Sequence, residues 1–338
     1  MNRRLLKNHV INKKQTDKTA HVGLGLRYID IDYQYSHVLN EYRKSFMLKH
    51  MIGVINSSVM KTDKRLISVG NMENGKDTYF FDYRDVLFEM IPCLPGTAKI
   101  ESITEKTEIP FLLGATEVTQ GLFSRVMGFN YSHDKDPKKP IVAISWFDCL
   151  SFCNKLSEYF WLTPYYTINS IEYGGRLYEN YRNDEYSTPL SIEYAEVKLN
   201  KKNNGFRLPS KTEWFLAYIA NNGDSITGDI HVLDSWSDKR KREMLSENGW
   251  VDLGSDTQLN QVAQKKPNGW GFYDMLGNVS EWCGDAPGYN EPEAFYCGFD
   301  SRAEVQDIMN TEPIYKKKLS NSEIKGDNIG FRIAMNLF

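Results

Sequence analysis

The sequence predicts an α+β fold in which short helices and strands are joined by long, ordered loops. Two stretches begin with a capping box, the side-chain pattern that marks a helix start: Ser145 with Asp148, and Ser210 with Glu213. Aromatic residues make up 13% of the chain, and they bury a large area even where secondary structure is irregular. The segment 268–283 combines five glycine or asparagine residues with four large aromatics and two carboxylates. This mixture indicates a folded loop inside a core.

Composition and charge exclude several classes of protein. The 338 residues include 41 Lys and Arg against 44 Asp and Glu, a formal charge of -3. We therefore expect neither a nucleic-acid partner nor a membrane surface. No apolar run approaches the roughly 20 residues of a membrane span. The basic segment Met1–Lys18 has no apolar stretch typical of a secretory signal, and five sparse cysteines are typical of reduced thiols. These features favour a cytoplasmic protein or a component of an assembled particle.

The first 85 residues are expected to form a separate segment. Residues 1–20 are predicted to be a frayed terminus or a docking arm. Alternating apolar residues predict a strand at 21–33, and mixed apolar spacing predicts a helix within 36–60. Asn74-Gly75 is typical of a turn between two strands. Residues 1–85 are thus a basic arm followed by a small α+β or docking element.

The rest of the chain, 86–338, is predicted to be one domain. Thr119 and Gly128 are expected to cap a helix over 120–127. The helix that begins after Ser145 buries an apolar face made of Cys149, Phe152, Cys153, Leu156 and Phe160. A polar, Tyr- and Asn-rich insert follows at 163–204. The helix that begins after Ser210 is expected to end near Asn222-Gly223, and the chain beyond it is mostly loop until a turn and terminal strand at 327–334.

Six motifs, in order, resemble the formylglycine-generating enzyme (sulfatase-modifying factor) domain family. They are Phe88-Glu-Met-Ile91; Gly114-Ala-Thr-Glu-Val-Thr-Gln120 with Val126-Met-Gly-Phe-Asn130; Pro140–Asp148 with Phe152–Ser157; Gly205–Trp214; Lys266–Asn278; and Gly330-Phe-Arg332. The resemblance covers roughly residues 86–338. It implies a C-type-lectin-like α+β fold with two main helices and much ordered loop.

The resemblance also implies a structural calcium site. The family's ligand set carries over to the Asp274 side chain, the Gly277 and Val279 carbonyls and the Glu281 carboxylate, which are oxygen ligands of the kind calcium takes. In the alternative, these carboxylates hydrogen-bond loop amides and no ion binds. A second family calcium site would begin at Asn248, but its Asp-x-Phe part has no counterpart, so we expect that site to be absent.

The family's reaction is not expected here. Its enzymes oxidise a substrate cysteine with copper(I) held by two cysteines, and copper(I) prefers such soft ligands. In this chain no cysteine follows Cys297. Cys283 and Cys297 could in principle rebuild a copper pair, but buried free cysteines are commonly core residues. The six histidines contain no H-x-x-x-H pair for the iron site of related enzymes.

Two functional hypotheses follow. The first is a non-catalytic binding or structural module that presents loops on a rigid scaffold to a protein or glycan ligand, or to a larger assembly through residues 1–85. Related folds occur in surface-display and virion proteins. The expected ligand-binding surface comprises Tyr296, Phe299, Asp300, Arg302 and Tyr315, and the insert 163–204 extends it. The alternative is an oxidoreductase that acts on a thiol or small molecule with a rearranged metal site.

Overall fold

The structure, a computed structural model, describes most of the chain after residue 66. The described ranges are 67–71, 77–100, 103–173, 192–219, 237–254, 258–285, 293–310, 313–318 and 328–337. The basic arm, the predicted strand at 21–33, the predicted helix within 36–60 and the Asn74-Gly75 turn lie outside these residues. No helix within the described ranges is long and apolar enough to cross a membrane.

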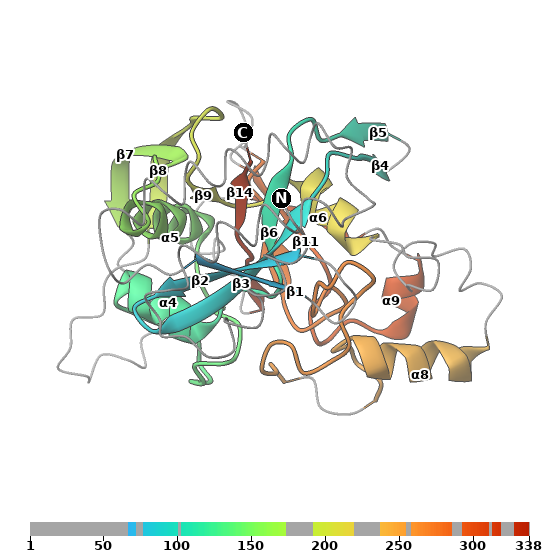
Figure 1. Ribbon diagram of the computed structural model, residues 1–338. Coiled ribbons are helices and arrows are strands. Elements are labelled where there is room, and N and C mark those ends of the chain that lie inside the picture. The colour runs from blue at the N-terminus through green and yellow to red at the C-terminus, as the bar shows by residue number, and fades with distance from the viewer. Residues whose placement is uncertain are drawn as a thin grey trace, which may run out of the picture.

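A six-stranded antiparallel sheet forms the centre of the fold (Figure 1). Its strands, in spatial order, are β1 (Ile67–Asn71), β2 (Asp77–Tyr83), β3 (Val86–Cys93), β6 (Phe111–Gly114), β14 (Ala334–Asn336) and β9 (Phe206–Arg207). The last strand, β14, lies between β6 and β9, so the end of the chain is paired on both sides. The expected boundary at residue 85 falls in the turn between β2 and β3, which pair from Tyr79–Met90 to Tyr83–Val86. The sheet therefore continues across that boundary.

A second sheet and two hairpins complete the β structure. The second sheet has the order β12 (Ile314–Lys318), β11 (Glu293–Cys297), β10 (Ser280–Trp282) and β13 (Ile329–Gly330), and its β10–β13 pair is parallel. The hairpins are β4 (Thr97–Ile100) with β5 (Ile103–Lys106), and β7 (Tyr166–Tyr173) with β8 (Ile192–Leu199). The β7–β8 hairpin lies inside the polar insert 163–204, so its described residues are mainly strand.

Three helices begin where the sequence predicts. They are α4 (Gln120–Met127), α5 (Trp146–Tyr159) and α6 (Lys211–Tyr218). Thr119 accepts a hydrogen bond from the backbone N–H of Leu122, and both predicted capping boxes form. The prediction for the end of α6 was wrong: the helix stops at Tyr218 with Ile219 as its cap, four residues before Asn222.

The prediction of a mostly irregular chain after α6 was also incomplete. Two further helices occur there, α8 (Asp238–Asn248) and α9 (Val305–Asn310). In α8 only Met244 and Leu245 are buried, so the helix carries no apolar stripe that its sequence could reveal. Figure 1 shows α4 and α5 on one side of the central sheet and α8 and α9 on the other.

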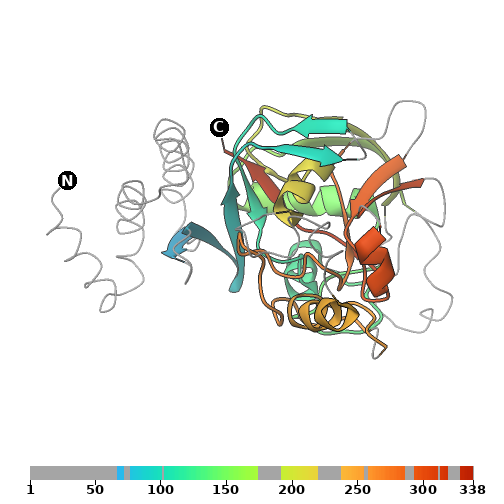
Figure 2. The same ribbon diagram turned by 90° about the vertical axis from the view of Figure 1, so that its right-hand side faces the viewer.

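Two hydrophobic clusters hold these elements together. The first packs α4 and α5 against the central sheet, and it contains the stacked rings of Phe123 and Phe152 with Phe331 edge-on to both. All five residues of the predicted apolar face of α5 are at most 1% exposed, which confirms that prediction. The second cluster surrounds Trp214 of α6 and includes Phe272. The β4–β5 hairpin extends over α6 (Figure 2), where Glu105 accepts hydrogen bonds from Lys211 and Thr212.

Candidate functional site

The loop 268–279, which leads into β10, is fixed by hydrogen bonds and by tight turns. Asn268 Nδ2 donates to the Ala217 carbonyl, and Asn268 Oδ1 accepts from the backbone amides of Trp270 and Phe272. Asp274 and Asn278 have φ of 58° and 62°, the left-handed region in which Asp and Asn are several-fold enriched. The loop is thus a rigid support, as its composition indicates.

This loop brings a group of charged side chains into the core, here called the acid cluster: Glu117, Asp274, Glu281 and Arg332. Each is at most 2% exposed. Arg332 Nε lies 2.6 Å from Glu281 Oε2 and Arg332 Nη2 lies 2.7 Å from Glu281 Oε1, a bidentate ion pair. Trp214 Nε1 also donates to Glu281 Oε2, at 2.9 Å. Both Glu281 oxygens are therefore satisfied by protein donors.

Glu117 and Asp274 form the second half of the acid cluster. Asp274 Oδ2 accepts from the Ala263 amide at 2.7 Å, and Glu117 Oε1 accepts from Asn278 Nδ2 at 3.0 Å. The remaining oxygens, Glu117 Oε2 and Asp274 Oδ1, are buried and have no protein donor. Burial, together with the charges of Asp274 and Glu281, raises the pKa of Glu117 well above its usual value. Burial also raises the pKa of Asp274, so the ionised form of both carboxyls is disfavoured at this place.

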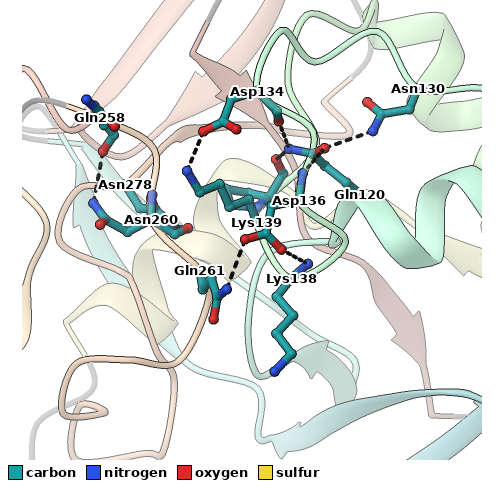
Figure 3. A network of polar contacts seen from close by, with 11 residues as sticks. Gln120, Asn130, Asp134, Asp136, Lys138, Lys139, Gln258, Asn260, Gln261 and Asn278 are labelled. Atoms are coloured by element: carbon teal, nitrogen blue, oxygen red, sulfur yellow. Dashed lines mark hydrogen bonds and ion pairs between the residues drawn. The ribbon is translucent and has the colours of Figure 1, made fainter.

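The segment 258–264 contacts the acid cluster through the Ala263 amide and through Asn278, and Figure 3 shows its polar contacts with the loop after α4. The Asn260 amide donates to Asn278 Oδ1 at 3.0 Å, and Gln261 Nε2 donates to Asp136 Oδ2 at 2.9 Å. Gln120 of α4 organises the other side, because its Oε1 accepts from Asn130 and from the Asp136 amide. Hydrogen bonds thus link the acid cluster to α4, and each of its four side chains is at most 2% exposed.

The expected ligand-binding residues lie on and after β11. Tyr296 and Tyr315 face each other across β11 and β12, with ring centroids 5.2 Å apart and planes 22° from parallel. Asp300 accepts from Arg302 at 2.6 Å, and the Arg302 side chain is 60% exposed. Phe299 is the exception: it is only 3% exposed and belongs to the cluster around Trp214. Its ring is part of the core and is not available to a ligand.

A model of the Sulfatase-modifying factor enzyme 1-like domain matches residues 58–337. The chain belongs to this family. Among curated relatives, the Chaperone protein LppX of Paenibacillus barcinonensis is 29% identical over 234 residues, which cover 66% of this chain and 79% of LppX. Among solved structures, Treponema denticola variable protein 1 matches with a TM-score of 0.58 and 23% identity over 76% of this chain and 98% of that chain. CarF matches with a TM-score of 0.52 and 20% identity, over 74% and 99%. These structures share the α+β fold of the family.

Two of the four implied calcium ligands, Asp274 and Glu281, differ in whether they have an oxygen open to an ion. Of the four implied ligands, Asp274 and Glu281 do lie in one cluster. Asp274 Oδ1 is buried without a protein donor, whereas both Glu281 oxygens are already paired with Arg332, which leaves that carboxylate no open oxygen for an ion. Within the described residues no group of three or more His, Cys, Asp or Glu side chains could hold a metal ion. The contacts favour the alternative in which protein hydrogen bonds hold the loop.

We therefore expect chelation of calcium to leave the protein's stability unchanged. The midpoint of thermal unfolding is predicted to be the same in EDTA and in added calcium, because Arg332 already neutralises Glu281. A midpoint that falls in EDTA in the wild type, but does not respond to EDTA in Asp274→Ala, would instead establish the calcium site.

The structure also brings together two cysteines that the sequence left apart. Cys283 follows β10 and Cys297 ends β11, and their sulfurs are 3.1 Å apart. Both residues are 0% exposed. The burial of Cys283 was predicted, and the two cysteines were considered together only as a rebuilt copper pair. Their contact depends on the pairing of β10 with β11, which the sequence did not predict. Cys149 and Cys153 are core residues of α5, as predicted.

Proposed function

We propose that this protein is a non-catalytic module that binds a protein ligand. The binding surface would consist of Tyr296, Asp300, Arg302 and Tyr315, here called the β11–β12 surface. The observation that carries the proposal is the half-buried Tyr296–Tyr315 stack on a paired strand scaffold, beside the exposed Arg302. Tyrosine and arginine are enriched at the centres of protein interfaces, and a stacked pair loses little conformational entropy on binding.

The similarity to a chaperone supports a protein ligand over a glycan. LppX is named a chaperone protein, and the aligned region spans 79% of its length. A chaperone acts by holding another polypeptide, which needs an exposed aromatic and polar surface but no reacting group. A glycan ligand is the other outcome that the test below distinguishes.

The loop after β11 supports a non-catalytic role. In the catalytic relatives implied by the resemblance, two cysteines follow this strand. Here Asp300 and Arg302 form an ion pair in that region, and no cysteine follows Cys297 in the chain. Oxygen-bearing and cationic side chains cannot replace thiolates as ligands of copper(I).

The proposal is tested by replacing both stacked tyrosines. Wild-type protein is expected to suppress the aggregation of reduced insulin, followed by light scattering, and Tyr296→Ala with Tyr315→Ala is expected to require at least about tenfold more protein. The control is Leu87→Ala with Ile103→Ala, two residues of β3 and β5 that lie outside the insert 163–204 and are 68% and 61% exposed. Equal activity of the two double variants, or no suppression by the folded wild type, would contradict the proposal. Binding only to immobilised oligosaccharides would identify a glycan ligand instead.

A second candidate function, an oxidoreductase that acts on a thiol, is favoured by one observation. The Cys283 and Cys297 sulfurs are close enough to act together, at 3.1 Å. The candidate ranks second because both residues are 0% exposed, so a substrate thiol has no access to them. Oxygen consumption with a cysteine-containing peptide and copper(I), lost in Cys297→Ser, would establish it.

We also propose that residues 1–85 attach the domain to a larger assembly, such as a surface or virion structure. Most of this segment lies outside the described residues, so the proposal rests on its basic composition, with six Lys and Arg within residues 1–18. The full-length protein is expected to comigrate with a particle, and deletion of residues 1–57 is expected to abolish this comigration.

A further inference from the structure

We propose that Cys283 and Cys297 are a redox-responsive pair that closes to a disulfide between β10 and β11. The two sulfurs are 3.1 Å apart in the thiol state. A disulfide bond is about 2.05 Å long, so closure needs a movement of about 1 Å. The inference does not depend on the proposed ligand.

The strand pairing fixes the two cysteines as neighbours. Glu281 is the cross-strand partner of Cys297, and Trp282 is the partner of Tyr296. One residue further, the Cys283 amide donates to the Phe295 carbonyl at 2.9 Å. Cys283 and Cys297 therefore lie diagonally on one face of the antiparallel pair, where side chains two positions apart come within reach of each other. The strand register thus places the two sulfurs in contact.

The other described cysteines have different surroundings. Cys149 Sγ lies 3.3 Å from the Ser145 carbonyl, in the preceding turn of α5. Cys93 Sγ lies 3.7 Å from the Ile91 carbonyl. Cys283 and Cys297 are thus the pair whose sulfurs the described structure brings into direct contact.

The surroundings of the pair disfavour the thiolate form of both cysteines. Burial raises the pKa of both thiols, and the charges of Asp285 and Glu281 add to this effect at each of them. Because both side chains are sealed from solvent, the exchange takes place during folding or when β11 opens locally.

The oxidant is a low-molecular-weight disulfide such as oxidised glutathione. The thiolate of one cysteine attacks one sulfur of the oxidant, which forms a mixed disulfide and releases the first glutathione thiolate. The thiolate of the other cysteine then attacks the protein sulfur of the mixed disulfide and releases the second glutathione thiolate. The protein loses two electrons and two protons, and the oxidant becomes two thiols that take up those protons.

The disulfide would join β10 covalently to the strand that carries Tyr296, next to Cys297. It closes a loop of about 15 residues, which stabilises a protein chiefly by restricting the unfolded chain. We expect the thermal midpoint of the oxidised protein to exceed that of the reduced protein by roughly 5–10 °C. The β11–β12 surface is then held more firmly in the oxidised state.

The test uses the full chain, unfolded in guanidinium and refolded in a reduced and oxidised glutathione mixture. Free thiols counted after unfolding are expected to fall from the chain's five cysteines to three, and peptide mapping without reductant is expected to find residues 283 and 297 cross-linked. Dithiothreitol should restore all five thiols and lower the midpoint. Cys93→Ser, a matched buried cysteine, should still form the cross-link, whereas Cys283→Val and Cys297→Ser should not.

Three outcomes would overturn the inference. The refolded wild type could keep five free thiols while its circular dichroism is native. The cross-link could join a different pair of cysteines. The purified protein could hold one equivalent of a soft metal ion that Cys283→Val removes. The thiol count and peptide map are measured on the wild type, so the test stands even if a variant fails to fold.

Discussion

Replacing Arg332 with methionine is expected to lower the free energy of unfolding by about 3–5 kcal/mol, measured by urea denaturation. The substitution removes a fully buried cation and leaves Glu281, which is 0% exposed, without its ionic partner. It also leaves the Gly114 and Tyr273 carbonyls without the donors that Arg332 supplies at 3.0 and 3.2 Å. The loss exceeds that of an ordinary ion pair because an uncompensated buried charge costs far more than a solvated one.

The matched control is Lys266→Met. Lys266 Nζ lies 2.6 Å from Glu247 Oε2, the same separation as in the buried pair, but the two side chains are 67% and 58% exposed. This change is expected to cost far less than Arg332→Met, because a solvent-exposed ion pair contributes little to stability. A double variant, Arg332→Met with Glu281→Leu, should be more stable than Arg332→Met alone, because it removes the orphaned carboxylate. Similar losses for Arg332→Met and Lys266→Met would show that burial does not control the energy of this pair.

The features that the sequence predicts well are local ones. The starts of α4, α5 and α6 depend on a hydroxyl and an amide three residues apart, as with Ser145 Oγ and the Asp148 amide at 3.0 Å. Such contacts form between residues within one helical turn, so the sequence alone predicts them. The sequence did not predict helix α8, because its residues are mostly polar and its stability depends on contacts with distant parts of the folded chain.

The candidate site could be predicted only in part, because its partners come from distant segments. The sequence indicates Asp274 and Glu281 as notable carboxylates. Arg332, which neutralises Glu281, is 51 residues away along the chain, and Glu117 is 161 residues from the Asn278 amide that it accepts from. A buried ion pair and a calcium site both use carboxylates. The sequence shows the carboxylates but not their partners, so the two kinds of site can be told apart only in the folded structure.

The direction of a side chain in a loop was likewise not predictable. Phe299 follows Gly298, which has a φ of 84° and turns the chain. A Cβ atom added to Gly298 would lie 3.0 Å from the Trp214 ring. That turn directs Phe299 into the core, while Asp300 remains partly exposed. The contact of Cys283 with Cys297 depends in the same way on strand register, which periodicity alone does not fix.

Gly277→Ala is expected to lower the free energy of unfolding by at least about 3–4 kcal/mol. Gly277 has a φ of +97°, and a Cβ there would lie 1.9 Å from the Trp250 carbonyl oxygen. That oxygen cannot move away cheaply. It accepts a hydrogen bond from the Asn278 amide at 2.9 Å, and the Trp250 amide donates to the Leu276 carbonyl at 2.8 Å. The added methyl group must break this pairing or distort the loop that carries the acid cluster.

The matched control, Gly128→Ala, separates the strain of the backbone from the clash. Gly128 caps α4 with a φ of +87°, and an added Cβ there meets nothing within 4 Å. Only the left-handed conformation is penalised, by about 1–2 kcal/mol. The excess loss in Gly277→Ala therefore measures how rigidly the segment at Trp250 is held against the loop. If urea denaturation gives the same loss of unfolding free energy for both variants, the segment at Trp250 moves away from the added methyl group at no cost. The acid cluster would then be held by the ion pair of Arg332 rather than by the backbone contact at Gly277.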